Sequence, residues 1–187
     1  MEYFSIKYKT GLVLSGGAVR GIAHLGVLQA IEEKKISIDI IAGASAGALA
    51  GAFIAEGYHS EEILDIFLSR KIFEIVRISV PRTGLLKVEG LKKILKSQLK
   101  SKNIEDLPKP LIISATNFCE GKVEYFTKGP LVEALIASAA FPIIFETAKI
   151  GNTAYLDGGI MDNLPINTIR DKCKKVIAVY ANPTGKM

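Results

Sequence analysis

A serine stands between an apolar run and a stretch rich in small residues. Residues 38–42 form the apolar run, interrupted only by Asp39 and typical of a buried strand, and the alanines and glycines of 46–57 favour a closely packed helix. Between them lies Gly43-Ala44-Ser45-Ala46-Gly47, the G-x-S-x-G pattern of a nucleophile elbow. Its glycines let the backbone turn sharply without a Cβ clash. The pattern predicts a strand–turn–helix unit that projects the Ser45 hydroxyl outward, although a plain packing turn has the same composition.

The histidines are few and poorly placed for a catalytic triad. The chain has two, His24 and His59, and none in its last 128 residues (187 − 59). In an α/β-hydrolase the histidine comes after both the serine and the acid, near the end of the domain. We interpret His24 as a structural residue within a helix and His59 as a surface residue. If Ser45 is a nucleophile, we expect a base other than histidine.

The order of the remaining patterns indicates an α/β fold. Strand and helix patterns alternate at the start of the chain, which favours a mostly parallel sheet between layers of helices, a three-layer α/β/α arrangement. We expect a single domain over 1–187, and Ser60 as the N-cap of a helix. The expected strands are 11–15, 38–42, 111–117, 123–126 and 176–180, and the expected helices are 20–34, 46–57, 88–99 and 130–140.

Composition limits the class of protein. Hydrophobic residues make up 49% and charged residues 23%, an ordinary globular balance. The longest run without charge, 40–55, has 16 residues, fewer than the roughly 20 that span a bilayer. The start of the chain lacks the pattern of a signal peptide. Cys119 and Cys173 have no metal-binding spacing and require no disulfide, so we expect a cytoplasmic protein that can associate peripherally with a membrane.

Net charge is +5, and lysines gather over 87–102. Such a cluster forms either a solvated helix face or a contact for anionic lipid headgroups. Nucleic acid is disfavoured as a partner because no known binding module accompanies the charge. The neighbouring apolar stretch, 72–86, is expected to form a lipid-facing rim.

A glycine-rich segment, Gly16-Gly17-Ala18-Val19-Arg20-Gly21, connects the first expected strand and helix. It lacks the lysine of a P-loop, because Ile22 follows Gly21. It also lacks the middle glycine of a dinucleotide fingerprint, because Ala18 occupies that position. What remains is a turn that presents backbone N–H groups, suited to an oxyanion hole or to a plain strand–helix connection.

The segment Asp157-Gly158-Gly159 offers a carboxylate followed by two residues that permit close backbone approach. Taken alone, it is ordinary turn chemistry. Aspartate has an unperturbed pKa of about 3.9, which makes it a weak base toward an alcohol. To act on Ser45 it must be partly desolvated and must work together with oxyanion stabilisation.

Together, these three segments resemble the patatin-like phospholipases, lipid acyl hydrolases with a Ser–Asp dyad. The resemblance implies Ser45 as nucleophile, Asp157 as its partner, and an oxyanion hole from Gly16, Gly17 and Ala18. It also implies a lipid or membrane-surface substrate and no metal or cofactor. The similarity covers about residues 10–180 and includes the blocks 16–21, 21–28, 43–47, 138–142 and 157–165.

The same resemblance assigns supporting positions and leaves two rivals. It implies that Arg20 braces the glycine-rich loop or meets a lipid phosphate. Apart from the resemblance, we interpret Asp162 and Asn163, which follow the Asp-Gly-Gly turn, as residues that hold a loop. The family often has a third glycine where this chain has Ala18. The rivals are a non-catalytic lipid-binding module and a histidine-dependent esterase or thioesterase. The remaining motif residues are Gly21, Gly43, Gly47, Gly158 and Gly159.

Overall fold

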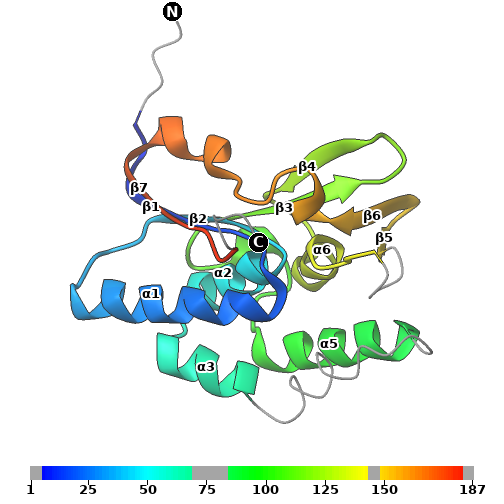
Figure 1. Ribbon diagram of the computed structural model, residues 1–187, viewed down its shortest axis with the longest axis horizontal. Coiled ribbons are helices and arrows are strands. Elements are labelled where there is room, and N and C mark those ends of the chain that lie inside the picture. Colours follow the sequence, from blue (N-terminus) through cyan, green and yellow to red (C-terminus); the bar gives the residue numbers. More distant parts are fainter. Residues whose placement is uncertain (1–5, 69–83, 143–147, 183–187) are drawn as a thin grey trace, which may run out of the picture.

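A seven-stranded sheet forms the centre of the described part of the chain (Figure 1). The structure is a computed structural model that describes residues 6–68, 84–142 and 148–182. The strand order is β5-β6-β3-β2-β1-β7, with β4 also paired to β3. The strands are β1 (Tyr8–Leu14), β2 (Ile40–Ala44), β3 (Leu111–Asn117), β4 (Lys122–Phe126), β5 (Ala148–Ile150), β6 (Thr153–Asp157) and β7 (Cys173–Val179).

The strand directions give a mixed, mostly parallel sheet. Strands β3, β2, β1 and β7 run parallel, whereas β4, β5 and β6 pair in antiparallel fashion. All residues of β2 and β3 are buried, as expected for central strands covered on both faces. The expected α/β class with a mostly parallel sheet is therefore confirmed.

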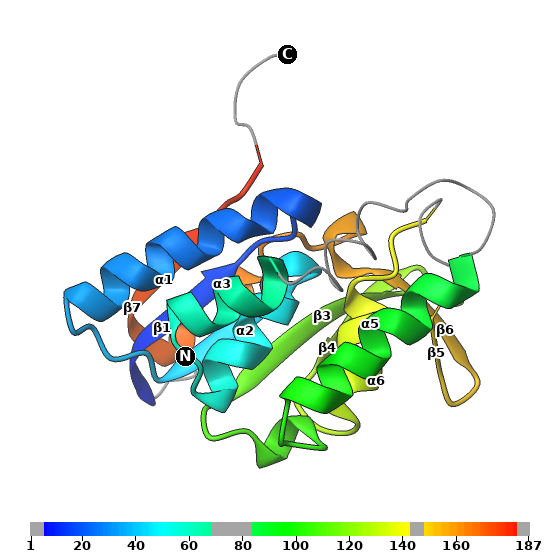
Figure 2. The ribbon, with the colours of Figure 1, turned by 90° about the horizontal axis from the view of Figure 1, so that it is seen from below.

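The α-helices cover one face of the sheet (Figures 1 and 2). Alternate strand residues, such as Leu12, Ile41 and Ile113, share one core cluster with residues of these helices. On the other face, Val13 and Ile112 pack around Ile169, next to the short 3₁₀ turns η4 (Ile166–Thr168) and η5 (Arg170–Lys172). Among the described residues this second layer contains no α-helix. The helices are α1 (Ala23–Glu33), α2 (Ala46–Glu56), α3 (Ser60–Leu68), α5 (Gly84–Gln98) and α6 (Leu131–Ser138).

Strands β2 and β6 meet end to end along one edge of β3. Ala44, the last residue of β2, pairs with Ser114, and Asp157, the last residue of β6, pairs with the next residue, Ala115. Strand β4 overlaps both pairings, so it must occupy the opposite edge of β3. Because β2 is parallel and β6 antiparallel to β3, the two strands end at the same point. This register brings Ser45, which follows β2, beside Asp157.

Several boundaries differ from the sequence predictions. The expected helix 20–34 is a 3₁₀ turn, η1 (Ala18–Ile22), followed by α1. The prediction of Ser60 as an N-cap is wrong: it is the first residue of α3, and its hydroxyl donates to Glu32. Of the expected lipid-facing rim, 72–83 lie outside the described residues. No helix in the described ranges is both long and apolar enough to span a membrane.

Candidate active site

The elbow is tight because two glycines allow backbones to touch. Ser45 has φ 50° and ψ −121°, a strained conformation for a residue with a side chain, and α2 begins at the next residue. A Cβ on Gly47 would lie 2.2 Å from the carbonyl oxygen of Leu14 in β1. A Cβ on Gly43 would lie 2.6 Å from the carbonyl oxygen of Gly47. Glycine at both positions therefore lets the first turn of α2 pack directly against β1 and β2.

The structure brings Ser45 and Asp157 into direct contact. The Ser45 Oγ donates a hydrogen bond of 2.6 Å to Oδ2 of Asp157. The other carboxylate oxygen, Oδ1, accepts the N–H of Gly159 at 2.7 Å, which fixes the plane of the carboxylate. Burial raises the pKa of Asp157 above its ordinary value, while the hydrogen bonds from Ser45 and Gly159 oppose the rise. The contacting carboxylate is therefore more basic than a solvated one.

The end of α6 binds both of these residues. The Oγ of Ser138 accepts the backbone N–H of Ser45 at 2.8 Å. Two residues later, the carbonyl oxygen of Ala140 accepts the N–H of Asp157 at 2.9 Å. The hydroxyl of Thr116 donates to the carbonyl of Asp157, also at 2.9 Å. The segment that follows α6 thus holds the elbow and the end of β6 in fixed relative positions.

The glycine-rich loop lies next to Ser45. A Cβ on Gly16 would be 3.1 Å from the Cβ of Ser45. The N–H of Gly16 already donates to the carbonyl of Asn163 at 3.2 Å. Within the described ranges, the N–H groups of Gly17 and Ala18 have no hydrogen-bond partner. Ala18 has φ 48°, in the left-handed region that favours glycine.

Polar side chains brace this loop from two sides. Asn182 donates to the carbonyl of Gly16 at 3.1 Å, and the exposed Arg20 donates to Asn182 at 3.5 Å. On the other side, Oδ1 of Asn163 lies 2.5 Å from the position of a Gly16 Cβ and 2.6 Å from that of a Gly159 Cβ. Asn182 lies in no motif of the sequence, so it could not be predicted as a residue of this site.

The remaining predicted glycines lie at close contacts around the site. A Cβ on Gly21 would be 2.6 Å from the Cβ of Ala46, where η1 meets α2. A Cβ on Gly158 would be 2.1 Å from the carbonyl oxygen of Ser114 in β3. The first contact packs η1 against α2, and the second packs the turn after Asp157 against β3.

Neither histidine is a hydrogen-bond partner of Ser45. Nε2 of the buried His24 lies 2.8 Å from the carbonyl oxygen of Ser15, and burial lowers the pKa of this imidazole. Nδ1 of His59 lies 3.2 Å from Oε1 of Glu32. Asp162, the other acid near the turn, accepts a hydrogen bond from the hydroxyl of Tyr125. These contacts disfavour a histidine-dependent esterase.

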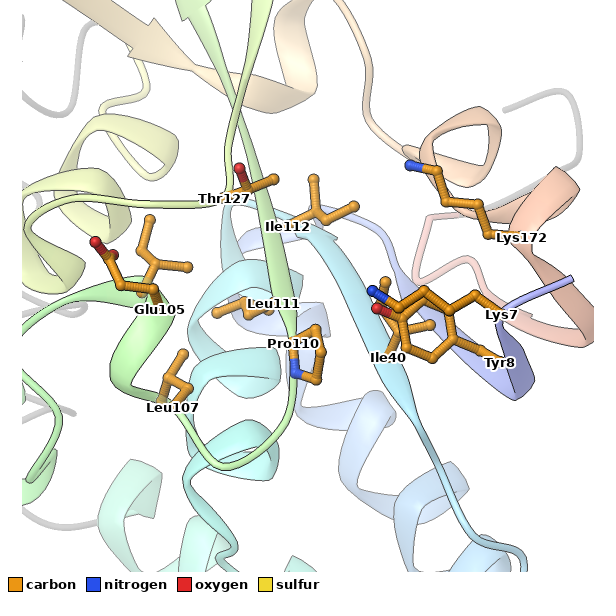
Figure 3. A pocket seen from close by; sticks show the side chains of 11 residues that line it. Lys7, Tyr8, Ile40, Glu105, Leu107, Pro110, Leu111, Ile112, Thr127 and Lys172 are labelled. Atoms are coloured by element: carbon orange, nitrogen blue, oxygen red, sulfur yellow. The ribbon is translucent and has the colours of Figure 1, made fainter. Parts of the chain in front are cut away.

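A cavity of about 380 Å³ lies at the opposite end of the sheet (Figure 3). Its lining includes Tyr8, Ile40 and Leu111, the first residues of β1, β2 and β3. Ser45 follows the last residue of β2, so this cavity is separate from the elbow. Among the described residues, no group of three or more His, Cys, Asp or Glu side chains is placed to hold a metal ion.

Comparison with known proteins identifies the family. The sequence profile described as Patatin-like phospholipase matches residues 12–169, most of the chain. The chain belongs to the patatin-like phospholipase family. Sequence relatives and solved structures of similar fold are also found.

Curated relatives are identical to this family member at about a third of the aligned positions. An uncharacterized NTE family protein of Mycobacterium tuberculosis is 34% identical over 168 residues, which are 86% of this chain and 45% of that protein. The lysophospholipase NTE1 of Saccharomyces cerevisiae is 30% identical, over 90% of this chain and 10% of its own length. A probable lipid hydrolase of Invertebrate iridescent virus 6 is 33% identical, over 88% of this chain and 65% of its own length. The chain thus spans less than two thirds of each of these relatives.

Solved structures share the patatin-like fold. VipD from Legionella pneumophila superposes with a TM-score of 0.65 at 18% identity, covering 90% of this chain and 49% of VipD. ExoU from Pseudomonas aeruginosa, in complex with SpcU, gives a TM-score of 0.58 at 19% identity, covering 76% of this chain and 40% of ExoU. At these identities the likeness concerns the fold.

Proposed function

We propose that this chain is a serine acyl hydrolase that cleaves ester-linked fatty acyl chains of lipids. The observation that carries the proposal is the 2.6 Å hydrogen bond from the Ser45 Oγ to Asp157 at a strained elbow. A hydroxyl so placed can lose its proton directly to the carboxylate as it attacks a carbonyl. Membership of the patatin-like phospholipase family supports a lipid substrate.

The proposed reaction has two halves. In the first, the Ser45 Oγ attacks the ester carbonyl carbon as its proton passes to Asp157, and the carbonyl electrons form an oxyanion. The tetrahedral intermediate then collapses, the alcohol departs with the proton from Asp157, and an acyl-enzyme remains. In the second half, water attacks the acyl-enzyme while Asp157 takes its proton, and the fatty acid is released as Ser45 recovers its hydrogen.

The loop N–H groups of Gly17 and Ala18 are the proposed donors to the oxyanion. Gly16 is a weaker candidate because its N–H already donates to Asn163. The loss of one such donor typically lowers turnover by about 10²–10³-fold. Because an aspartate is a weak base, the mechanism needs this stabilisation together with the raised pKa of Asp157.

Labelling with a fluorophosphonate probe tests the proposal, with p-nitrophenyl butyrate as a soluble substrate. The wild-type protein should be labelled at Ser45 and should release p-nitrophenol. Ser45→Ala should abolish labelling, and Asp157→Asn should lower turnover by about 10²–10⁴-fold, the usual contribution of a general base. Hydrolysis that persists in Ser45→Ala would refute the assignment. A folded wild-type protein that neither reacts with the probe nor hydrolyses the ester would instead be the non-catalytic lipid-binding module.

A further inference from the structure

Exposed apolar side chains gather around the candidate site. Five large hydrophobic residues in three segments are 42–66% exposed. Isolated exposed hydrophobic residues are common on soluble proteins, but a group of them around one site marks an interaction surface. We call this group the apolar rim, and it consists of Val19, Ile22, Phe141, Ile160 and Met161.

Each segment of the apolar rim directly follows a residue that contacts Asp157 or belongs to the candidate oxyanion loop. Val19 and Ile22 lie in η1, directly after the candidate oxyanion loop. Phe141 follows Ala140, whose carbonyl binds the N–H of Asp157. Ile160 and Met161 follow Gly159, whose N–H binds the Asp157 carboxylate. The rim therefore borders the candidate site from three separate parts of the chain.

The segments also lie close to one another. The side chain of Asn163 stands between Gly16 and Gly159, so the glycine-rich loop and the turn η3 (Gly158–Ile160) are separated by a single amide group. The turn η3 also packs against α6, whose end leads to Phe141. Arg20, between the two rim residues of η1, is exposed and adds a cation there. This combination of apolar groups with a cation suits the boundary between acyl chains and headgroups.

We propose that the apolar rim docks onto the surface of a lipid aggregate, a micelle or bilayer, and holds Ser45 at the lipid–water boundary. The inference rests on the proposed function, because a lipid ester resides in such an aggregate. The rim buries its side chains among acyl chains near the headgroups, which removes apolar area from water and lowers the free energy of the bound state. Docking by this route depends little on salt, unlike docking through the lysines of 87–102.

The test measures binding apart from catalysis. In a Ser45→Ala background, Val19→Ser/Ile160→Ser is compared with a control that removes similar side chains, Ile6→Ser/Ile36→Ser. The control residues are 54% and 42% exposed and lie before β1 and β2, at the end of the sheet away from Ser45. Co-sedimentation with phosphatidylcholine vesicles at high salt gives the partition coefficient of each protein. Thermal melting shows whether each is folded.

The rim variant should bind at least about tenfold more weakly than the Ser45→Ala parent, while the control binds like the parent. Equal binding by the rim variant and the parent would overturn the proposal. So would a parent that binds only anionic vesicles and only at low salt, because the lysines would then account for docking. Neither result depends on hydrolysis, so failure of the rim is distinguishable from failure of the acyl hydrolase assignment.

Discussion

The backbone N–H of Ser45 donates to the Oγ of Ser138 across 93 positions of sequence. Ser45 holds a strained φ of 50°, and such a conformation persists only where neighbouring groups stabilise it. The buried hydroxyl of Ser138 supplies one of these contacts. Because Ala140 binds Asp157 from the same segment, the end of α6 sets the geometry of the pair.

Ser138→Ala should both slow acylation of Ser45 and destabilise the fold. Loss of the hydroxyl leaves the Ser45 N–H without its partner, which costs about 1–3 kcal/mol of stability, and it loosens the elbow. We expect fluorophosphonate labelling to slow roughly 10- to 100-fold, as for a small displacement of a reacting group. Ser60→Ala is the matched control. It also removes a buried hydroxyl, but that hydroxyl donates to Glu32, which is not part of the candidate site. Equal labelling rates in the two variants would contradict a positioning role.

Asp157→Asn should abolish most activity and yet stabilise the protein at neutral pH. The folded pKa of Asp157 is raised, so its ionisation costs folding free energy at pH values above the folded pKa. That cost disappears below the unfolded pKa of about 3.9, where the group is protonated in both states. Urea unfolding of both proteins at pH 7 and at low pH measures the sign of the difference in their free energies of unfolding. A variant less stable than wild type at pH 7 would contradict it.

The same raised pKa predicts where activity is lost at acid pH. Only the ionised carboxylate can accept the Ser45 proton, so kcat/KM should fall as the pH drops through the folded pKa of Asp157. The midpoint should lie above the value of about 3.9 for a free aspartate. Hydrolysis of p-nitrophenyl butyrate across acid pH measures it, while thermal melting at each pH separates titration from unfolding.

Gly47→Ala should disrupt the elbow, whereas Gly26→Ala should not. The new methyl at 47 would lie 2.2 Å from the Leu14 carbonyl, so α2 must move away from β1. We expect the free energy of unfolding to fall by about 4 kcal/mol or more, a loss that overpacking and backbone strain in a core can reach. Gly26 lies in α1 with no atom within 4 Å of its added Cβ, so alanine there should stabilise by about 0.5–1 kcal/mol. Chemical denaturation measures both.

Ala18→Gly should stabilise the fold. Ala18 adopts φ 48°, where a Cβ costs roughly 1–2 kcal/mol and glycine is unstrained. We expect the free energy of unfolding to rise by about 1 kcal/mol, after the greater backbone entropy that glycine loses on folding is included. Ala30→Gly, in the helical part of α1, should instead lose about 1 kcal/mol. Opposite signs in thermal melts support the strain at Ala18, and a loss in both contradicts it.

Local patterns were sufficient to predict most elements of the fold. The strand at 111–117 matches β3, and the helix expected at 46–57 matches α2 within one residue, because the sheet core and the small residues of the elbow leave clear signals. The helix at 20–34 was predicted less well, since its first turn is 3₁₀ where the glycine-rich loop joins it. The second layer was expected as helices, yet the described residues place only short 3₁₀ turns around Ile169 there.

The sequence by itself determined the strand–turn–helix that carries Ser45, since its causes are local: glycine spacing, an apolar run and a small-residue helix. It also singled out Asp157 as a candidate through a motif. Only the tertiary structure placed the two side chains in contact, and only it revealed the contacts of Ser138 and Asn182 with the site. The physical reason is strand register. Two strands from distant parts of the chain end at neighbouring positions of β3, and such long-range pairing has no signature in local periodicity.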